Sequence, residues 1–182
     1  MVPIRRLLAV VTVALSLAAA GCGRTSGTTA VPLACRTAQL GVTAGRGGVA
    51  AGHSGFPLLF RNTGGRACLL SGYPGIALLG SDGGAAIEAQ PVPNGYIGGL
   101  RDYSGGPLPE IRLLPGETAS ALVEGDDAPP VGVAPCGPFA AIRVTPPHAG
   151  PSVRLAVRVP CSDVEVHPVV PGTTGQGQPD GR

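Results

Sequence analysis

Apolar and polar residues alternate one by one in many segments of the chain beyond its N-terminal apolar run. The clearest segment is Ser152–Val159, where Val and Leu occupy every second position and Arg154, Ala156 and Arg158 lie between them. A period of two predicts a β-strand with one face toward a core and the other toward water. No segment beyond the apolar run keeps a helical period for three turns, so the pattern predicts an all-β protein.

Eight more segments show the same alternation or a short apolar run bounded by turn residues. In one of them Asp163, Glu165 and His167 alternate with two valines, so these three side chains are expected to face water. Turn residues such as Asn62-Thr63-Gly64-Gly65 separate the segments. This spacing predicts an immunoglobulin-like β-sandwich of about seven to nine short strands. The eight further strands are expected at Gln39–Thr43, Pro57–Arg61, Ala67–Gly72, Ile76–Leu79, Ile111–Leu114, Ala119–Glu124, Ala141–Thr145 and Cys161–His167.

The N-terminus has the pattern of an export signal. Arg5 and Arg6 precede an apolar run from Leu7 to Ala20, which is shorter than the about 20 residues of a membrane-spanning helix. Small residues lead directly to Cys22, an arrangement that resembles the lipoprotein processing site of bacteria. The sequence therefore predicts a signal peptide over residues 1–21 and a lipid on the Cys22 thiol.

Ordinary signal cleavage after Ala20 is the alternative, because Ala18 and Ala20 also fit such a site. The cysteine count favours the lipoprotein, since acylation of Cys22 leaves four of the five cysteines, an even number suited to an oxidising compartment. A thioether lipid with an N-acyl chain anchors a protein without a basic patch. We expect the protein on the outer face of the cell membrane, held there by Cys22, or secreted if Cys22 is not acylated.

Composition divides the remaining chain into a tether over residues 22–32, one β-domain over 33–170 and a disordered polar tail over 171–182. Four domain cysteines allow three pairings. We favour Cys35–Cys68 and Cys136–Cys161, because each pair joins the neighbourhoods of successive strand segments. Each closure is expected to stabilise the domain by roughly 3–4 kcal/mol. That contribution is useful in a chain without tryptophan, whose core must be aliphatic.

The charges of the chain argue against several classes of function. All 13 basic residues are arginine, and without Arg5 and Arg6 the remaining 11 balance the 11 acidic residues. A neutral chain with few aromatic residues lacks the basic surface of a nucleic-acid binder. The absence of lysine excludes Schiff-base chemistry and the P-loop lysine. No cofactor is predicted.

Candidate catalytic and metal-binding residues are few. His53 and Ser54 could serve a hydrolase, but the G-x-S-x-G motif is absent, and His53 is expected to be a loop imidazole bonded to backbone. Glu124, Asp126 and Asp127 could hold Ca²⁺, but a solvated turn at a strand end is the favoured interpretation. The sequence thus predicts no catalytic residue and no metal site. A hydrolase with an unrecognised site is the alternative function.

Three motifs support a family resemblance: Ala51-Gly52-His53, Leu59-Phe60-Arg61-Asn62-Thr63-Gly64, and Cys68-Leu69-Leu70-Ser71-Gly72-Tyr73-Pro74-Gly75-Ile76. Together with the late cysteine pair, they resemble the DUF4232 domain of secreted actinobacterial proteins, over about Leu33 to His167. The resemblance implies an exported, often lipid-anchored β-sandwich with an unassigned biochemical role. It carries over no catalytic residue.

A Gly- and Pro-rich stretch, Pro91–Pro109, is expected to be a long loop with little regular structure. Tyr96, Arg101 and Tyr103 lie in it, and Tyr and Arg are typical anchors of protein interfaces. Loops on a rigid scaffold are common recognition surfaces. The sequence therefore predicts a non-catalytic binding or structural module, whose possible contacts are these three side chains and whose partner is an envelope protein or a small ligand.

Overall fold

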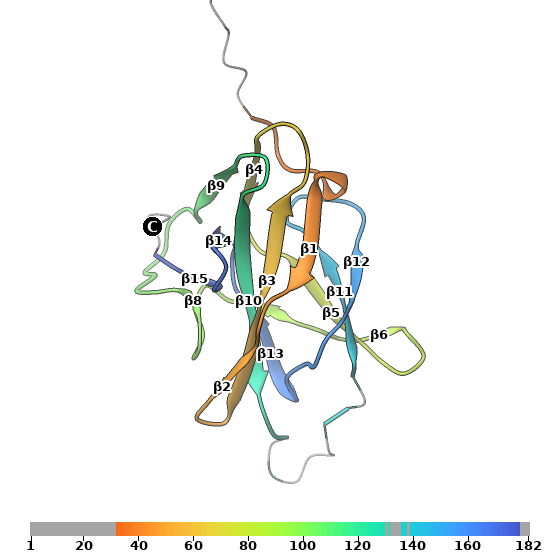
Figure 1. Cartoon of the computed structure of the whole chain (residues 1–182). Helices are drawn as coiled ribbons and strands as arrows, with labels where there is room; N and C mark the ends of the chain where they lie inside the picture. Colours follow the sequence, from red (N-terminus) through yellow and green to blue (C-terminus); the bar gives the residue numbers. More distant parts are fainter. Residues whose placement is uncertain (1–31, 130, 132–135, 138, 179–182) are drawn as a thin grey trace, which may run out of the picture. The chain divides into compact units, whose positions relative to one another are not determined.

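The computed structural model describes residues 32–129, 131, 136–137 and 139–178 (Figure 1). Within these residues there are fifteen strands and one short 3₁₀ turn, η1 (Thr37–Gln39), which confirms the all-β class. No helix among them is long or apolar enough to cross a membrane. The strands are β1 Leu40–Ala44, β2 Gly48–Ala50, β3 His53–Asn62, β4 Cys68–Ser71, β5 Gly75–Leu79, β6 Ala85–Glu88, β7 Gln90–Pro91, β8 Gly99–Leu100, β9 Glu110–Leu113, β10 Thr118–Asp126, β11 Ala141–Thr145, β12 Val153–Ala156, β13 Ser162–Val166, β14 Val170–Pro171 and β15 Gln176–Gly177.

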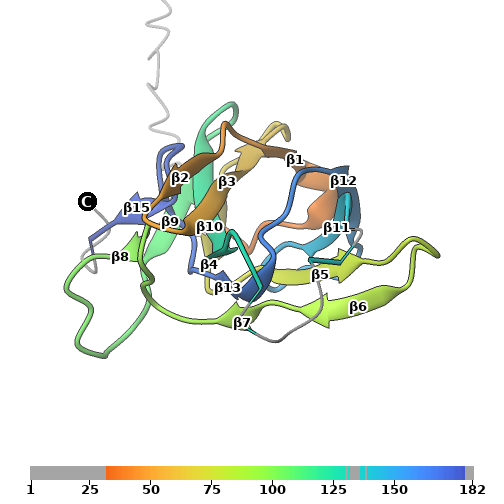
Figure 2. The same ribbon diagram turned by 90° about the horizontal axis from the view of Figure 1, so that it is seen from below.

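Two larger sheets share one core (Figures 1 and 2). The first has the order β1-β3-β10-β13-β7, with β2 beside β3 and β14 beside β10. The second has the order β12-β11-β5-β6. Two short pairs, β4 with β9 and β8 with β15, complete the strand pairing of the described residues. This is a sandwich-like arrangement, whereas the immunoglobulin-like detail stays a prediction.

The core forms where the apolar sides of the two sheets meet. The first sheet contributes Leu58, Phe60 and Val123, and the second contributes Leu78 and Ile142; all five are fully buried. The predicted alternation around β12 is also confirmed. There Val153, Leu155, Val157 and Val159 pack partly buried against the core, and the arginines between them are exposed. The period-two pattern therefore identified the core-facing side of these strands.

Both expected disulfides are present. Cys35–Cys68 is buried, with both cysteines 2% exposed, and it ties the start of the domain to β4. Cys136–Cys161 lies toward the exterior and joins the segment after β10 to the residue before β13. Disulfides persist in oxidising compartments, so the pair indicates an extracytoplasmic location. Cys22, the predicted lipidation site, lies outside the described residues.

Asn62 fixes the turn between β3 and β4. Its side-chain oxygen accepts a hydrogen bond from the Gly64 N–H at 2.9 Å, which forms an Asx turn at one of the predicted turn segments. Its amide nitrogen donates to the carbonyls of Arg66 and Leu113, at 2.8 and 3.0 Å. Asn62 is fully buried, and these contacts satisfy its polar atoms inside the domain.

The C-terminal segment differs from its prediction. A disordered tail was expected from Pro171, but residues 171–178 are ordered as far as the structure describes them. Strand β14 pairs with β10, and β15 pairs in parallel with β8. The Oγ atom of Ser120 also accepts a hydrogen bond from the Gly175 N–H at 2.9 Å. Residues 171–178 therefore pair with β10 and β8 despite their polar composition.

Candidate functional site

The functional candidate lies on the outer face of the first sheet, where β10 and β13 pair. Glu124 stands directly opposite Glu165 in this antiparallel ladder. His167 follows two residues after Glu165, so it lies on the same face. In a sheet, residues directly opposite each other and residues two apart on one strand point to the same face. Glu124, Glu165 and His167 therefore share the face that is turned away from the aliphatic core. The alternation had placed Glu165 and His167 on the water side.

Two of these residues are nevertheless buried, which corrects the prediction that they are solvated. His167 is fully buried, and Glu124 lies inside β10 with 2% exposure instead of in an exposed acidic turn. The reason is the segment 92–100, which was expected to be a loop and crosses this face. It contains little regular structure beyond β8, as predicted, but it is held down by hydrogen bonds. A loop distant in sequence has closed over a polar patch.

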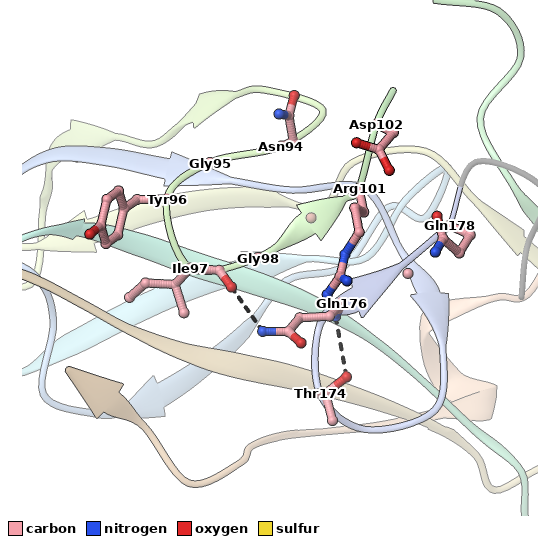
Figure 3. Close-up of a pocket in the computed structure, with 12 residues that line it drawn as sticks. Asn94, Gly95, Tyr96, Ile97, Gly98, Arg101, Asp102, Thr174, Gln176 and Gln178 are labelled. Atoms are coloured by element: carbon pink, nitrogen blue, oxygen red, sulfur yellow. Dashed lines mark hydrogen bonds between the residues drawn. The ribbon is translucent and has the colours of Figure 1, made fainter. Parts of the chain in front are cut away.

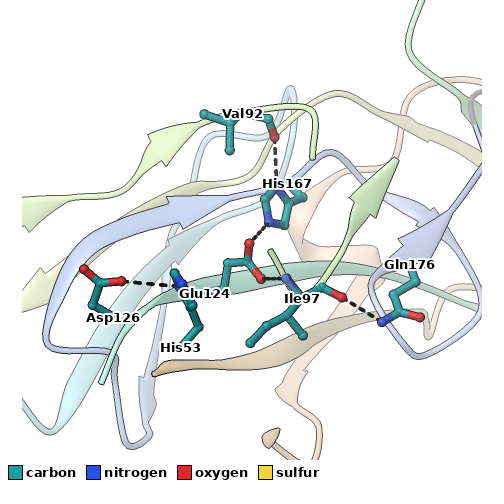
Figure 4. Close-up of polar contacts among 7 residues, drawn as sticks. All are labelled: His53, Val92, Ile97, Glu124, Asp126, His167 and Gln176. Carbon is teal, nitrogen blue, oxygen red and sulfur yellow. Dashed lines mark hydrogen bonds and ion pairs between the residues drawn. The ribbon is translucent and has the colours of Figure 1, made fainter. Parts of the chain in front are cut away.

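Glu124 and His167 hold this segment (Figure 4). Glu124 Oε2 accepts a hydrogen bond from the Ile97 N–H at 2.7 Å. His167 Nδ1 lies 3.0 Å from the Val92 carbonyl oxygen, and a carbonyl can only accept, so Nδ1 carries a proton and donates. His167 Nε2 lies 3.2 Å from Glu124 Oε1, at ion-pair distance. The two side chains thus join β10, β13 and the covering loop.

The carboxylates of this patch have opposite pKa shifts. Burial raises the pKa of Glu124, but the hydrogen bond that Glu124 accepts from the Ile97 N–H and the proximity of the His167 imidazole outweigh it, so the pKa lies below its ordinary value. Glu124 is therefore ionised at neutral pH. Partial burial raises the pKa of Glu165, and the negative charges of Glu124 and Asp163 add to that effect. The patch holds two close carboxyl groups of different acidity.

Two glycines allow the loop to come this close. A Cβ atom on Gly95 would collide with Glu124 Oε1 and lie 2.8 Å from the ring of His167. Gly99 has a φ of +90°, and a Cβ there would lie 2.6 Å from the Pro93 carbonyl oxygen. A side chain at either position would push the loop away from the buried pair. The glycine content of the segment is therefore a packing requirement.

The outer side of the same loop lines a groove of about 580 Å³ (Figure 3). Tyr96 lies at one end of it, 62% exposed, and Arg101 and Gln176 lie toward the other end. Gln176 donates from Nε2 to the Ile97 carbonyl at 2.8 Å, so the C-terminal segment also fixes the loop. The lining is predominantly amide, hydroxyl and backbone, with one guanidinium and one carboxylate, which suits a polar partner.

The three predicted contact residues do not gather together. Tyr96 and Arg101 line the groove, whereas Tyr103 is not among the described residues that line it. Tyr103 is half-buried and donates its hydroxyl to the Gly106 carbonyl. It also lies near Tyr73, whose pKa is raised by burial and by the charge of Tyr103. Tyr103 therefore shapes its own turn instead of joining Tyr96 and Arg101.

His53 is part of a strand, not of the loop that the sequence suggested. It starts β3 opposite Asp126, and its Nδ1 atom lies 3.3 Å from Asp126 Oδ1. Its ring stacks on Tyr96 with a centroid separation of 4.4 Å. Ser54 follows on the same strand, and successive residues of a strand point to opposite faces. The structure therefore pairs His53 with Asp126 and Tyr96, not with Ser54.

Sequence reasoning missed the Glu124–His167 pair. Forty-three positions separate the two residues in the sequence, and the Val92 carbonyl that orients the imidazole is a further 32 positions before Glu124. No local motif joins them. One signal was available: Glu124 follows Leu122 and Val123 within a predicted buried strand, and a charge in such a place requires a partner.

Comparison with known proteins gives one family match. The model described as "Domain of unknown function (DUF4232)" matches residues 35–173. No curated protein and no solved structure matches the chain. The matched range includes both disulfides, the buried pair and the loop that covers it, but it ends before β15.

Proposed function

The chain belongs to the DUF4232 family, a domain of unknown function, and we propose that it is an exported, lipid-anchored envelope protein with a non-catalytic binding role. In this proposal Cys22 carries the lipid and residues 22–32 form the tether. The β-domain is then presented on the outer side of the cell membrane. The two disulfides support the compartment, because such bonds persist where the surroundings are oxidising.

One observation carries the binding role: side chains of the underlying sheet and of the C-terminal segment fix the backbone of the loop that bears Tyr96 and Arg101. Glu124 accepts a hydrogen bond from the Ile97 N–H, and Gln176 donates one to the Ile97 carbonyl. His167 donates a hydrogen bond to the Val92 carbonyl. An exposed loop without such anchors would lose conformational entropy on binding a partner. Preorganisation removes part of that cost and strengthens binding without adding contacts.

Tyr96 and Arg101 have the chemistry of interface anchors. The Tyr96 ring offers a large apolar surface with a polar tip, and it is steadied by stacking on His53. Arg101 offers several donors in a rigid fork, which suits carboxylate and carbonyl groups. Both side chains reach one groove from the same loop. We therefore expect a partner with a polar surface that places acceptor groups near Arg101.

Crosslinking in intact cells, followed by affinity purification and mass spectrometry, tests this proposal. We expect a reproducible envelope partner that is lost when Tyr96→Ala and Arg101→Ala are combined. Arg154→Ala, at an exposed arginine on β12, is the matched control and should retain the partner. Equal recovery with the double variant would exclude the groove as the contact surface.

The lipid anchor is tested separately by Cys22→Ala. If Cys22 is acylated, this variant moves from the membrane fraction to the soluble exported fraction, because no second anchor is proposed. A wild-type protein that is itself found in the soluble fraction would contradict the anchor and leave the groove unaffected.

A further inference from the structure

Three side chains on the outer face of the first sheet offer metal-binding atoms close together. Glu124 and Glu165 come from β10 and β13, and His167 follows directly after β13. One donor atom from each of the three lies within 4.8 Å of the other two. Glu124 and His167 are buried and Glu165 is half-buried, so the cluster is closed on one side and open on the Glu165 side.

His167 is held in the orientation of a metal ligand. Its Nδ1–H donates to the Val92 carbonyl, so in the neutral imidazole Nε2 carries the free lone pair. Metal-bound histidines characteristically donate their second ring nitrogen to a carbonyl or a carboxylate, which fixes the tautomer and the ring. Nε2 is fully buried and has no hydrogen-bond partner among the described residues. Buried polar atoms without a hydrogen-bond partner are rare in native proteins, and an ion bound to Nε2 would account for this one.

The distance to Glu124 supports the same interpretation. Nε2 and Oε1 are 3.2 Å apart, without the alignment of a hydrogen bond. A charge-assisted hydrogen bond between nitrogen and carboxylate is typically about 2.7–2.9 Å. Two ligands that each lie about 2.0 Å from a tetrahedral metal are about 3.3 Å apart. The observed separation therefore matches an edge of a coordination polyhedron better than a short charge-assisted hydrogen bond.

An ion pair of Glu124 with His167 alone leaves Glu165 unexplained. Like charges directly opposite each other in a ladder destabilise a sheet, and Glu165 stands opposite Glu124. A divalent cation would balance both carboxylates and use the free nitrogen. Glu165 need only swing toward the other two, and its half-exposed position leaves room for that movement.

From this geometry we propose that Glu124, Glu165 and His167 form a binding site for a divalent transition-metal ion, with Zn²⁺ as the best fit. Zn²⁺ accepts one imidazole nitrogen and carboxylate oxygens in tetrahedral geometry. Ca²⁺ takes six to eight oxygen ligands and fits an imidazole poorly. The fourth position would face the open side and hold water or a group of a partner. This site does not depend on the proposed binding role, since it needs no partner.

Isothermal titration of the mature protein with Zn²⁺, supported by native mass spectrometry, tests the site. We expect one Zn²⁺ per chain and no comparable binding of Ca²⁺. Glu165→Gln is the informative variant, because Glu165 makes no hydrogen bond through its side chain among the described residues and its loss should not disturb the fold. It should weaken Zn²⁺ binding at least about tenfold.

Two controls locate the ion. Asp163→Asn removes the same charge from the same strand and should leave Zn²⁺ binding within about twofold. His53→Gln removes the other histidine–carboxylate pair and should also retain binding. Nitrogen NMR of the histidines should show Zn²⁺ shifting Nε2 of His167 while Nδ1 keeps its proton. The proposal is overturned if the wild type binds no Zn²⁺, or if Glu165→Gln binds it as tightly as the wild type.

Discussion

The two faces of strand β10 are both buried, but by different means. Ala119, Ala121 and Val123 face the other sheet. Their ladder partners on the neighbouring strand β3, Phe60, Leu58 and Phe56, face the same apolar interior. Ser120 and Glu124 face outward and are covered by loops. The inner face is stabilised by the burial of apolar surface, an effect that is non-directional and requires no specific partner. On the outer face Leu122 is also buried, but Ser120 and Glu124 on either side of it each accept a hydrogen bond from one backbone N–H of a covering loop.

This difference predicts different responses to substitution. Apolar packing is shared among many neighbours, so damage on the inner face lowers the stability of the whole domain. A polar anchor acts on one segment, so damage on the outer face releases that segment first.

Phe60→Ala should lower the free energy of unfolding by about 3–5 kcal/mol, because it empties a fully buried position in the core. Chemical denaturation followed by circular dichroism measures the change. Hydrogen exchange should speed up throughout both sheets. Arg61→Ala, at the exposed neighbouring position, should change stability by less than about 0.5 kcal/mol. A loss confined to one loop would contradict a shared core.

Glu124→Gln should lower the free energy of unfolding by about 1–3 kcal/mol, because a neutral amide replaces the charged acceptor beside His167. Hydrogen exchange should rise most in residues 92–100, while the strands of the second sheet stay protected. Glu110→Gln, at an exposed position of β9, is the control. Uniform loss of protection would show that the outer face is part of the same cooperative unit as the core.

Ser120→Ala should cost about 1 kcal/mol, because it removes the acceptor for the buried Gly175 N–H. Faster exchange is expected in residues 172–177, with little change in residues 92–97. This variant separates the two covering loops from each other. If both loops loosen equally, they move as one body. Ser81→Ala, at an exposed turn, should leave both unchanged.

Acid should release the outer face before the core in protein kept free of metal. The pKa of Glu124 is lowered in the folded state, so its stabilising contribution is present above the unfolded pKa and is lost as pH falls through the folded pKa. Glu165, with its raised pKa, acts in the opposite direction, so Glu165→Gln should make the Glu124 effect clearer. Exchange in residues 92–100 as a function of pH is the measurement. An unchanged loop at acidic pH would show that its other bonds suffice.

The sequence predicted the inner face well because alternation is a local signal. All nine predicted strands have counterparts, and both disulfides follow from strand order. The outer face depends on contacts between distant segments, such as His167 with Val92 and Gln176 with Ile97. The short strands β7, β8, β14 and β15 exist only through such pairing. A period-two pattern shows which residues leave the core, but not what later covers them.

The pairing of β15 with β8 has a practical consequence for anyone handling this protein. Gln178, at the end of the described segment, lies in the wall of the groove with Tyr96 and Arg101. An affinity tag fused after residue 182 would follow Gln178 by only four residues, a span short enough for the tag to reach the groove. A tag inserted in the exposed turn at Ser81–Asp82 would avoid the groove. The position of the affinity tag therefore affects whether a binding experiment can detect a partner of the groove.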